Sequence, residues 1–223
     1  MSFSRNLKGK AIKVWEDGYN QPFVQELGQG TLDKKKFQFY LLQDYQYLLQ
    51  YAKVFALATV KADSEALMIR LTNVQHSVLD EINVHKQYME KFGISSEEMM
   101  AAGPSLFNRA YTANMMAAGQ AGDLADLLAA VFPCAWTYND YGRRLKEQYA
   151  DRLDDNFYKT WIETYASPEF EESFAWFYDT LDELVAEKTD AQRAKVEQIF
   201  ISSVEFEYLF WDMAYKQEMS YQL

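Results

Sequence analysis

Apolar residues recur at intervals of three and four along most of the chain, which is the spacing of amphipathic helices. Long helices are predicted over residues 33–62, 64–93 and 123–149 and from Thr189 onward. Shorter helices are predicted over residues 4–19, 95–99, 104–119 and 155–166 and from Ser167, whereas residues 20–32 are interpreted as a glycine-containing loop. Only four prolines and nine glycines interrupt the pattern, and no repeat or linker divides it. The sequence therefore predicts an all-α helical bundle, with residues 1–223 in a single domain.

Residues that favour helix ends stand where the apolar pattern starts and stops. Asp33 is a good N-cap for the first long helix, and Gly93 follows the second as a stop signal. Ser95 and Glu98 have the spacing of a capping box, and Thr189 is placed to cap the last helix. These residues support the predicted boundaries independently of the hydrophobic pattern.

Composition narrows the class of protein. With 223 residues, 49% of them hydrophobic, the chain can bury a large core without disulfides or a structural metal. One cysteine cannot form an intramolecular bridge and the N-terminal residues lack the apolar run of a secretory signal, so we expect a cytoplasmic protein. No window approaches the roughly 18 apolar residues of a membrane span. Aromatic residues such as those in "FAWFYDTL" exceed what one domain of this size hides, and they predict an interface between subunits.

The charge of the chain bears on its partners. The formal net charge is −11 and the basic residues are scattered along the sequence. Proteins that bind nucleic acids or anionic membranes draw affinity from clustered basic residues, so neither partner is expected.

The only cysteine, Cys134, directly follows Pro133 inside a predicted helix. A proline there donates no N–H group and crowds the carbonyl of Ala129, so a kink or an irregular turn is expected. Two interpretations stay open at this point. Either core packing accepts the distortion around a small buried thiol, or the distortion directs Cys134 toward a ligand.

Three helix stripes combine aromatic side chains with a reactive group. Because they recur at helical spacing, the members of each stripe share one face: Cys134, Tyr138 and Tyr141; Tyr40, Asp44, Tyr47 and Tyr51; Ser203, Glu207, Phe210, Trp211 and Ala214. Aromatic stripes alone usually belong to a core, but burying a carboxylate without partners is unfavourable. A tyrosine-lined pocket is therefore predicted, in which the cysteine acts as a thiolate nucleophile, Asp44 holds or accepts its proton and Glu207 acts on the substrate.

Five segments in this order resemble the thiaminase II (TenA) family: "FYLLQDYQYLLQYAKVFA", "AYTANMM", "FPCAWTYNDYG", "WIETYAS" and "SSVEFEYLFWDMAY". The resemblance implies a haem-oxygenase-like bundle without haem or another cofactor, assembled as a homotetramer. It also implies hydrolysis at the methylene carbon of a 4-amino-2-methylpyrimidine. The substrates would be the aminomethyl-pyrimidine formed when thiamine degrades and thiamine itself, and the hydroxymethyl-pyrimidine product would be salvaged into thiamine.

The family's functional residues carry over to matching positions. The resemblance implies that Cys134 is the nucleophile, that Asp44 binds the pyrimidine amine and supports the thiol, and that Glu207 donates a proton to the ring. It implies a substrate-binding set that comprises Tyr47, Tyr111, Tyr138 and Tyr165, with His85 and Phe210 as weaker members. Two features depart from the pattern: Asn114 stands where members commonly have histidine, and Glu205 offers a second acid that cannot share a helix face with Glu207.

The sequence also bears on two other classes of protein. A di-metal carboxylate oxidase would need Glu-x-x-His pairs, which the sequence lacks; Glu81 and His85 are four residues apart and are read as a surface pair or a core hydrogen bond, so no metal site is expected. A binding or regulatory protein that only holds thiamine-like ligands is the alternative that stays open. Such a protein would not need the thiol.

Overall fold

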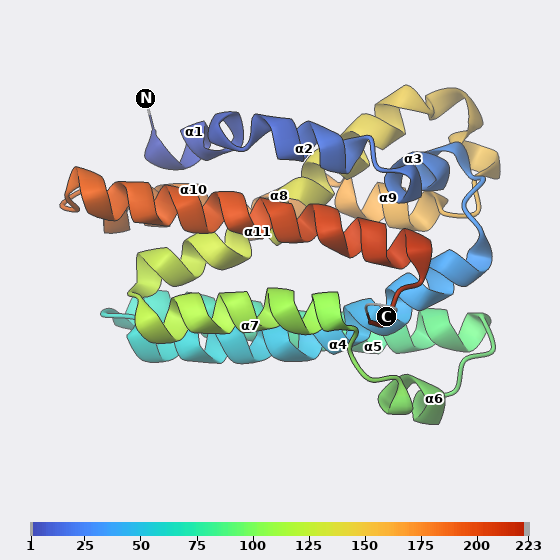
Figure 1. Ribbon diagram of the computed structural model, residues 1–223, viewed down its shortest axis with the longest axis horizontal. Helices are drawn as coiled ribbons and strands as arrows, with labels where there is room; N and C mark the ends of the chain where they lie inside the picture. The colour runs from blue at the N-terminus through green and yellow to red at the C-terminus, as the bar shows by residue number, and fades with distance from the viewer. Residues whose placement is uncertain (1, 221–223) are drawn as a thin grey trace. The chain divides into compact units, whose positions relative to one another are not determined.

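The computed structural model describes residues 2–220, apart from the side chains at positions 84, 85, 87, 88, 91 and 96. Within this range the chain forms helices and their connections, which confirms the predicted all-α class. The elements, in chain order, are α1 (Phe3–Lys10), α2 (Ile12–Tyr19), α3 (Pro22–Gln29), α4 (Lys34–Lys61), α5 (Glu65–Lys91), α6 (Ser96–Ala101), α7 (Leu106–Ala121), α8 (Leu124–Gln148), the 3-10 helix η1 (Ala150–Asp155), α9 (Lys159–Tyr165), α10 (Pro168–Val185) and α11 (Asp190–Lys216) (Figure 1).

Most predicted helix ends are confirmed. The helix α4 begins directly after Asp33, and Gly93 follows α5 with a φ of 73°, the left-handed conformation that glycine adopts most readily. Ser95 and Glu98 form the predicted capping box, in which each side chain accepts a hydrogen bond from the other's backbone N–H. At the start of α11 the N–H of Gln192 donates to the hydroxyl of Thr189 (3.3 Å).

The first 32 residues differ from the prediction in two ways. The predicted helix over residues 4–19 is divided at Ala11 into α1 and α2. The segment interpreted as a loop contains the two-turn helix α3, so that interpretation is wrong. The Gln21 side chain accepts a hydrogen bond from the N–H of Phe23 (2.6 Å), and Pro22 occupies the first turn, where its missing N–H costs nothing. Gly30 ends the helix with a φ of 76°.

The helices divide into two compact units that are each discontinuous in sequence. Unit 1 comprises Met1–Asp33 and Leu128–Asp212, and unit 2 comprises Lys34–Leu127 and Met213–Leu223. In unit 1, α1 packs against α10. In unit 2, α5 and α7 both pack along α4 (Figure 1). That residues 1–223 act as one domain stays a prediction.

The helix α8 continues through Pro133 without a break. Every residue from Leu124 to Pro133 is buried, so this half of the helix is enclosed on all sides, as its largely apolar sequence requires. Asp126 is the one charged residue in this stretch, and its carboxylate accepts a hydrogen bond from the N–H of Asp123 (3.1 Å). Pro133 itself is buried, so packing surrounds the place where the Ala129 carbonyl is expected to lack its hydrogen bond. Cys134, the next residue, is partly exposed.

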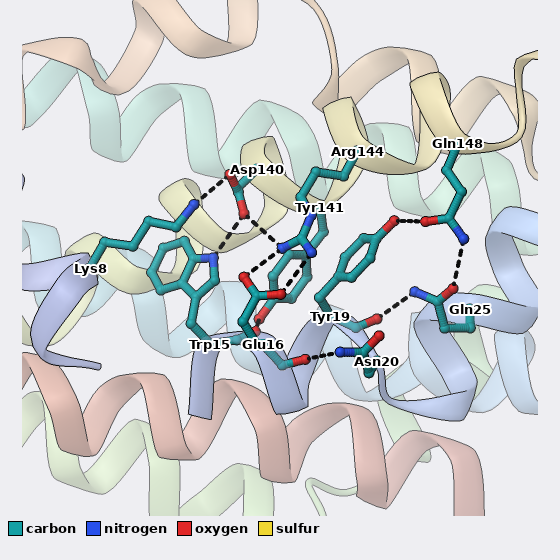
Figure 2. Close-up of polar contacts among 10 residues, drawn as sticks. All are labelled: Lys8, Trp15, Glu16, Tyr19, Asn20, Gln25, Asp140, Tyr141, Arg144 and Gln148. Carbon is teal, nitrogen blue, oxygen red and sulfur yellow. Dashed lines mark hydrogen bonds and ion pairs between the residues drawn. The ribbon is translucent and has the colours of Figure 1, made fainter. Parts of the chain in front are cut away.

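A polar network joins α1 and α2 to the second half of α8 (Figure 2). The carboxylate of Asp140 accepts hydrogen bonds from Lys8 Nζ (2.7 Å) and Trp15 Nε1 (2.8 Å). One turn later, Arg144 donates two hydrogen bonds to the Glu16 carboxylate, at 3.0 and 2.8 Å. Such forked contacts between guanidinium and carboxylate are directional as well as strong.

The network continues toward α3. The Arg144 guanidinium lies 3.6 Å from the centre of the Tyr19 ring, and the Tyr19 hydroxyl donates to Gln148 Oε1 (Figure 2). The side chain of Gln25 donates to the Tyr19 carbonyl (2.7 Å). These contacts hold the N-terminal helices of unit 1 along α8, the helix that carries Cys134.

Arg144→Gln should lower the free energy of unfolding by about 1–2 kcal/mol, because it removes the forked contact with Glu16 and the contact with the Tyr19 ring. Arg143→Gln is the matched control, since the neighbouring Arg143 side chain is 58% exposed and makes one ion pair, with Glu171 (3.1 Å). We expect the control to cost no more than about 0.5 kcal/mol. Urea denaturation of both variants measures the difference, and equal losses would contradict a structural role for this network.

Candidate active site

Cys134 lies half-buried on α8, one helical turn before Tyr138, which belongs to an aromatic cluster in unit 1. One turn further along the helix, the ring of the buried Tyr138 contacts three other aromatic rings. Its centre is 4.8 Å from that of Tyr165, 5.0 Å from that of Trp211 and 5.7 Å from that of Trp161. The cluster therefore joins α8, α9 and α11 on the helix face that carries the thiol.

Glu207 lies on α11, one turn before Trp211, and is only 2% exposed. The second acid in this segment, Glu205, is exposed. Burial thus distinguishes the two carboxyls in the way that helix geometry requires, because residues two positions apart face different directions. Phe210 is also buried, and its ring centre is 6.3 Å from that of Trp211.

Tyr141, on the same helix, connects α8 to α2. Its hydroxyl donates a hydrogen bond to the carbonyl of Trp15 (2.7 Å), and its ring is 1% exposed. Burial raises the pKa of Tyr141 well above its ordinary value, and the nearby carboxyl of Glu207 raises it further whenever that carboxyl is ionised. The phenol therefore stays protonated. Within unit 1, Cys134, Tyr138 and Glu207 are carried by two helices that contact each other through Tyr138 and Trp211.

Unit 2 holds a second group of the predicted residues. Asp44 is 5% exposed, and Tyr47 and Tyr111 are 3% and 2% exposed. The ring centres of Tyr47 and Tyr111 are 5.3 Å apart, which brings α4 and α7 together, and the Tyr47 ring stacks on that of Tyr51 at 5.2 Å. Asn114, at the position where histidine was expected from the resemblance, is half-buried on α7.

Other expectations have different outcomes. The side chain of His85 lies outside the described residues. Trp161 was not identified from the sequence, although its position four residues before Tyr165 places both rings on one helix face; their centres are 4.7 Å apart. Among the residues that the structure describes, no group of three or more His, Cys, Asp or Glu side chains could hold a metal ion. In that same range, no helix combines the length and apolar character needed to cross a bilayer.

Comparison with known proteins identifies the family. A family model described as TENA/THI-4/PQQC family matches residues 10–217. The chain belongs to this family. The resemblance found in the five sequence segments is thereby confirmed, and the match takes in Asp44, Cys134 and Glu207.

Individual relatives agree with this assignment. The chain is 43% identical over 220 residues to a protein from Halalkalibacterium halodurans named aminopyrimidine aminohydrolase, and the alignment covers 98% of each chain. A solved structure from Silicibacter sp. TM1040, titled as a TenA family transcription regulator, superposes with a TM-score of 0.87 at 30% identity, covering 94% of each chain. A structure from Shewanella denitrificans titled as a heme oxygenase-like fold has a TM-score of 0.65 at 17% identity, covering 96% of this chain and 92% of that one. The haem-oxygenase-like fold expected for the TenA family is therefore confirmed.

Proposed function

We propose that this TenA-family protein is a thiaminase II-type hydrolase, an aminopyrimidine aminohydrolase of thiamine salvage. It would hydrolyse aminomethyl-pyrimidine to hydroxymethyl-pyrimidine, and it would cleave thiamine to give the same product. One observation carries the proposal: the half-buried Cys134 and the buried Glu207 lie on two helices joined through an aromatic cluster. The name of the Halalkalibacterium halodurans relative supports the choice of substrate.

The proposed reaction uses nucleophilic catalysis at an aromatic ring. The thiolate of Cys134 adds to the pyrimidine carbon next to the one that bears the methylene group, while Glu207 gives its proton to a ring nitrogen. The new C–S bond breaks aromaticity, and the ring electrons expel the leaving group from the methylene carbon, an amine or, in thiamine, the thiazole. Water then adds to that carbon and gives up a proton, which matches the proton that the leaving amine takes. The ring nitrogen returns its proton to Glu207, the C–S bond breaks, and aromaticity returns. Two smaller barriers thus replace one that direct displacement would face.

The surroundings of Glu207 suit a proton donor. A carboxyl group gives up a proton in this step only if it is protonated beforehand, and exclusion from water favours the neutral form. Glu207 is 2% exposed and lies one turn from Trp211. Aromatic rings also suit the planar substrate, because they stack on it without competing for its hydrogen bonds.

The remaining roles rest on the resemblance to the family. Asp44 is proposed to accept a hydrogen bond from the 4-amino group of the pyrimidine and to support the thiol. Tyr47, Tyr111, Tyr138 and Tyr165 are proposed to contact the substrate, and His85 and Phe210 are weaker members of this set.

A second function is a protein that binds a thiamine-like ligand and regulates without turnover. The Silicibacter structure, titled as a transcription regulator, favours it. The two functions are distinguished by measuring kcat/KM for aminomethyl-pyrimidine and for thiamine. Turnover of either substrate supports the hydrolase, and binding without turnover of both would replace it with the regulatory function.

We also propose a homotetramer in the cytoplasm, where a single thiol stays reduced. In the segment "FAWFYDTL", Phe174 and Phe177 are buried inside unit 1, whereas Trp176 and Tyr178 are partly exposed. Further exposed apolar side chains lie on α4 and α5 of unit 2: Val60 is 81% exposed and Ile69 54%. Light scattering at micromolar concentration should give about four times the chain mass of 26.0 kDa, and a mass near 26.0 kDa would contradict the proposal.

A further inference from the structure

Unit 2 contains a pair of buried amide side chains next to Asp44. Gln43 on α4 and Asn108 on α7 are each 1% exposed. Asn108 Nδ2 donates to the main-chain carbonyl of Gln43 (2.7 Å) and lies 3.2 Å from Gln43 Oε1. Burying an amide costs free energy unless its polar atoms are hydrogen-bonded, and Asn108 Oδ1 has no partner among the described residues. The hydrogen bonds of Asn108 Nδ2 therefore have to offset this cost.

The hydrogen bond from Asn108 to the main chain is made at the peptide group between Gln43 and Asp44. The carbonyl of this peptide belongs to Gln43 and its nitrogen to Asp44, so Asn108 holds the backbone immediately before Asp44. The orientation of the Asn108 amide is also fixed, because a rotation by half a turn would place its oxygen against two acceptors. Asn108 therefore contributes as a donor that attaches α7 to α4 at this point.

The start of α7 is tied to the same amide pair. Gln43 Oε1 accepts a hydrogen bond from the N–H of Ser105 (2.8 Å), and Gln43 Nε2 donates to the carbonyl of Gly103 (3.3 Å). The hydroxyl of Ser105, in turn, accepts from the N–H of Asn108 (3.0 Å). Directional bonds thus fix where α7 begins along α4, which apolar packing alone would leave free to slide.

This register decides the positions of the proposed substrate-binding residues of unit 2. Tyr47 lies one turn after Gln43, Tyr111 lies three residues after Asn108, and their ring centres are 5.3 Å apart. We propose that Asn108 is a positioning residue, whose amide sets the placement of Asp44 relative to Tyr111. The inference rests on the proposed role of Asp44 in substrate binding.

The test compares two substitutions on the same helix. Asn108→Ala removes the attachment to α4. Thr112→Val is the control, because Thr112 is also buried but its hydroxyl donates to carbonyls of its own helix, those of Asn108 (2.9 Å) and Arg109 (3.3 Å). We expect Asn108→Ala to lower kcat/KM by at least about tenfold, mainly through KM, since misplacement of a binding group by about 1 Å has effects of this size or larger. The control should stay within about threefold at a similar melting temperature.

A double-mutant cycle distinguishes positioning from general destabilisation. In an Asp44→Asn background, Asn108→Ala should lower kcat/KM by less than about threefold, because the group that it positions is already impaired. The same tenfold loss in both backgrounds would overturn the inference, and so would wild-type kcat/KM for Asn108→Ala in the normal background. If Asn108→Ala does not fold, Asn108→Ser is measured in both backgrounds with the same criteria.

The two proposals fail in different ways. If Asp44→Asn alone keeps wild-type kcat/KM, the proposed role of Asp44 is wrong whatever Asn108 does. If Asp44→Asn is impaired while Asn108→Ala is not, the role of Asp44 stands and the positioning role of Asn108 is wrong.

Discussion

Cys134→Ser is expected to abolish turnover while keeping the fold and the affinity for the aminopyrimidine. A serine hydroxyl is almost never ionised near neutral pH, so the variant should lose hydrolysis by orders of magnitude. Because Cys134 is only half-buried and oxygen is smaller than sulfur, the melting temperature should change little. Single-turnover assays measure the chemical step, and calorimetric titration with aminomethyl-pyrimidine measures binding.

Ala135→Ser is the matched control for this experiment. Ala135 is the next residue on α8 and is also partly exposed, so the substitution introduces a hydroxyl at the neighbouring position and leaves the thiol in place. It should keep turnover close to that of the wild-type protein. Activity of Cys134→Ser near the wild-type level would remove the thiol from the mechanism and favour a protein that only binds its ligand.

The second large effect separates the two proposed acids. Glu207→Gln should lower kcat strongly with little change in the dissociation constant, because the amide keeps the shape of the side chain but cannot deliver a proton. Asp44→Asn should instead weaken binding and turnover together, because it loses the charged acceptor for the substrate amine. Loss of such a charge-assisted hydrogen bond costs about 1.5–3 kcal/mol, or roughly tenfold to a hundredfold in affinity.

Glu205→Gln controls for the removal of one carboxylate from α11. Glu205 is exposed two residues before the buried Glu207, so its substitution should leave both kcat and affinity unchanged. Dissociation constants and kcat for the three variants are measured with the same substrate. The reverse pattern, with weaker binding in Glu207→Gln and intact binding in Asp44→Asn, would show that the two roles are exchanged.

Most of the fold could be predicted because helix signals are local. The long helices α4, α5, α8 and α11 follow from the spacing of apolar residues, and the capping box at Ser95 from a four-residue pattern. The helix α3 was missed because part of what fixes its end is distant in sequence. Asn156 donates to the carbonyls of Leu27 (3.1 Å) and Gly28 (2.8 Å), and no local pattern announces a partner so far along the chain.

The candidate site, too, could be predicted only as far as local sequence patterns reach. Stripes at helical spacing correctly placed Tyr138 one turn from Cys134, and the buried Glu207 one turn from Trp211. Which helix faces which is a tertiary property, and the sequence offered no sign that Gln43 and Asn108 pair across 65 positions. Periodicity therefore finds the face on which a residue lies, whereas the partner of that face is found only in the structure.

The discontinuity of unit 1 has a consequence for biosynthesis. Trp15 and Asp140 are hydrogen-bonded but 125 positions apart, so at about 5–20 residues per second the ribosome needs roughly 6–25 s to supply the partner. Through that interval α1, α2 and α3 leave the exit tunnel without the helix on which they dock. The uninterrupted stretch Lys34–Leu127 of unit 2 emerges in the meantime and can begin to fold first, which leaves the nascent N-terminal helices as the segment most dependent on chaperones.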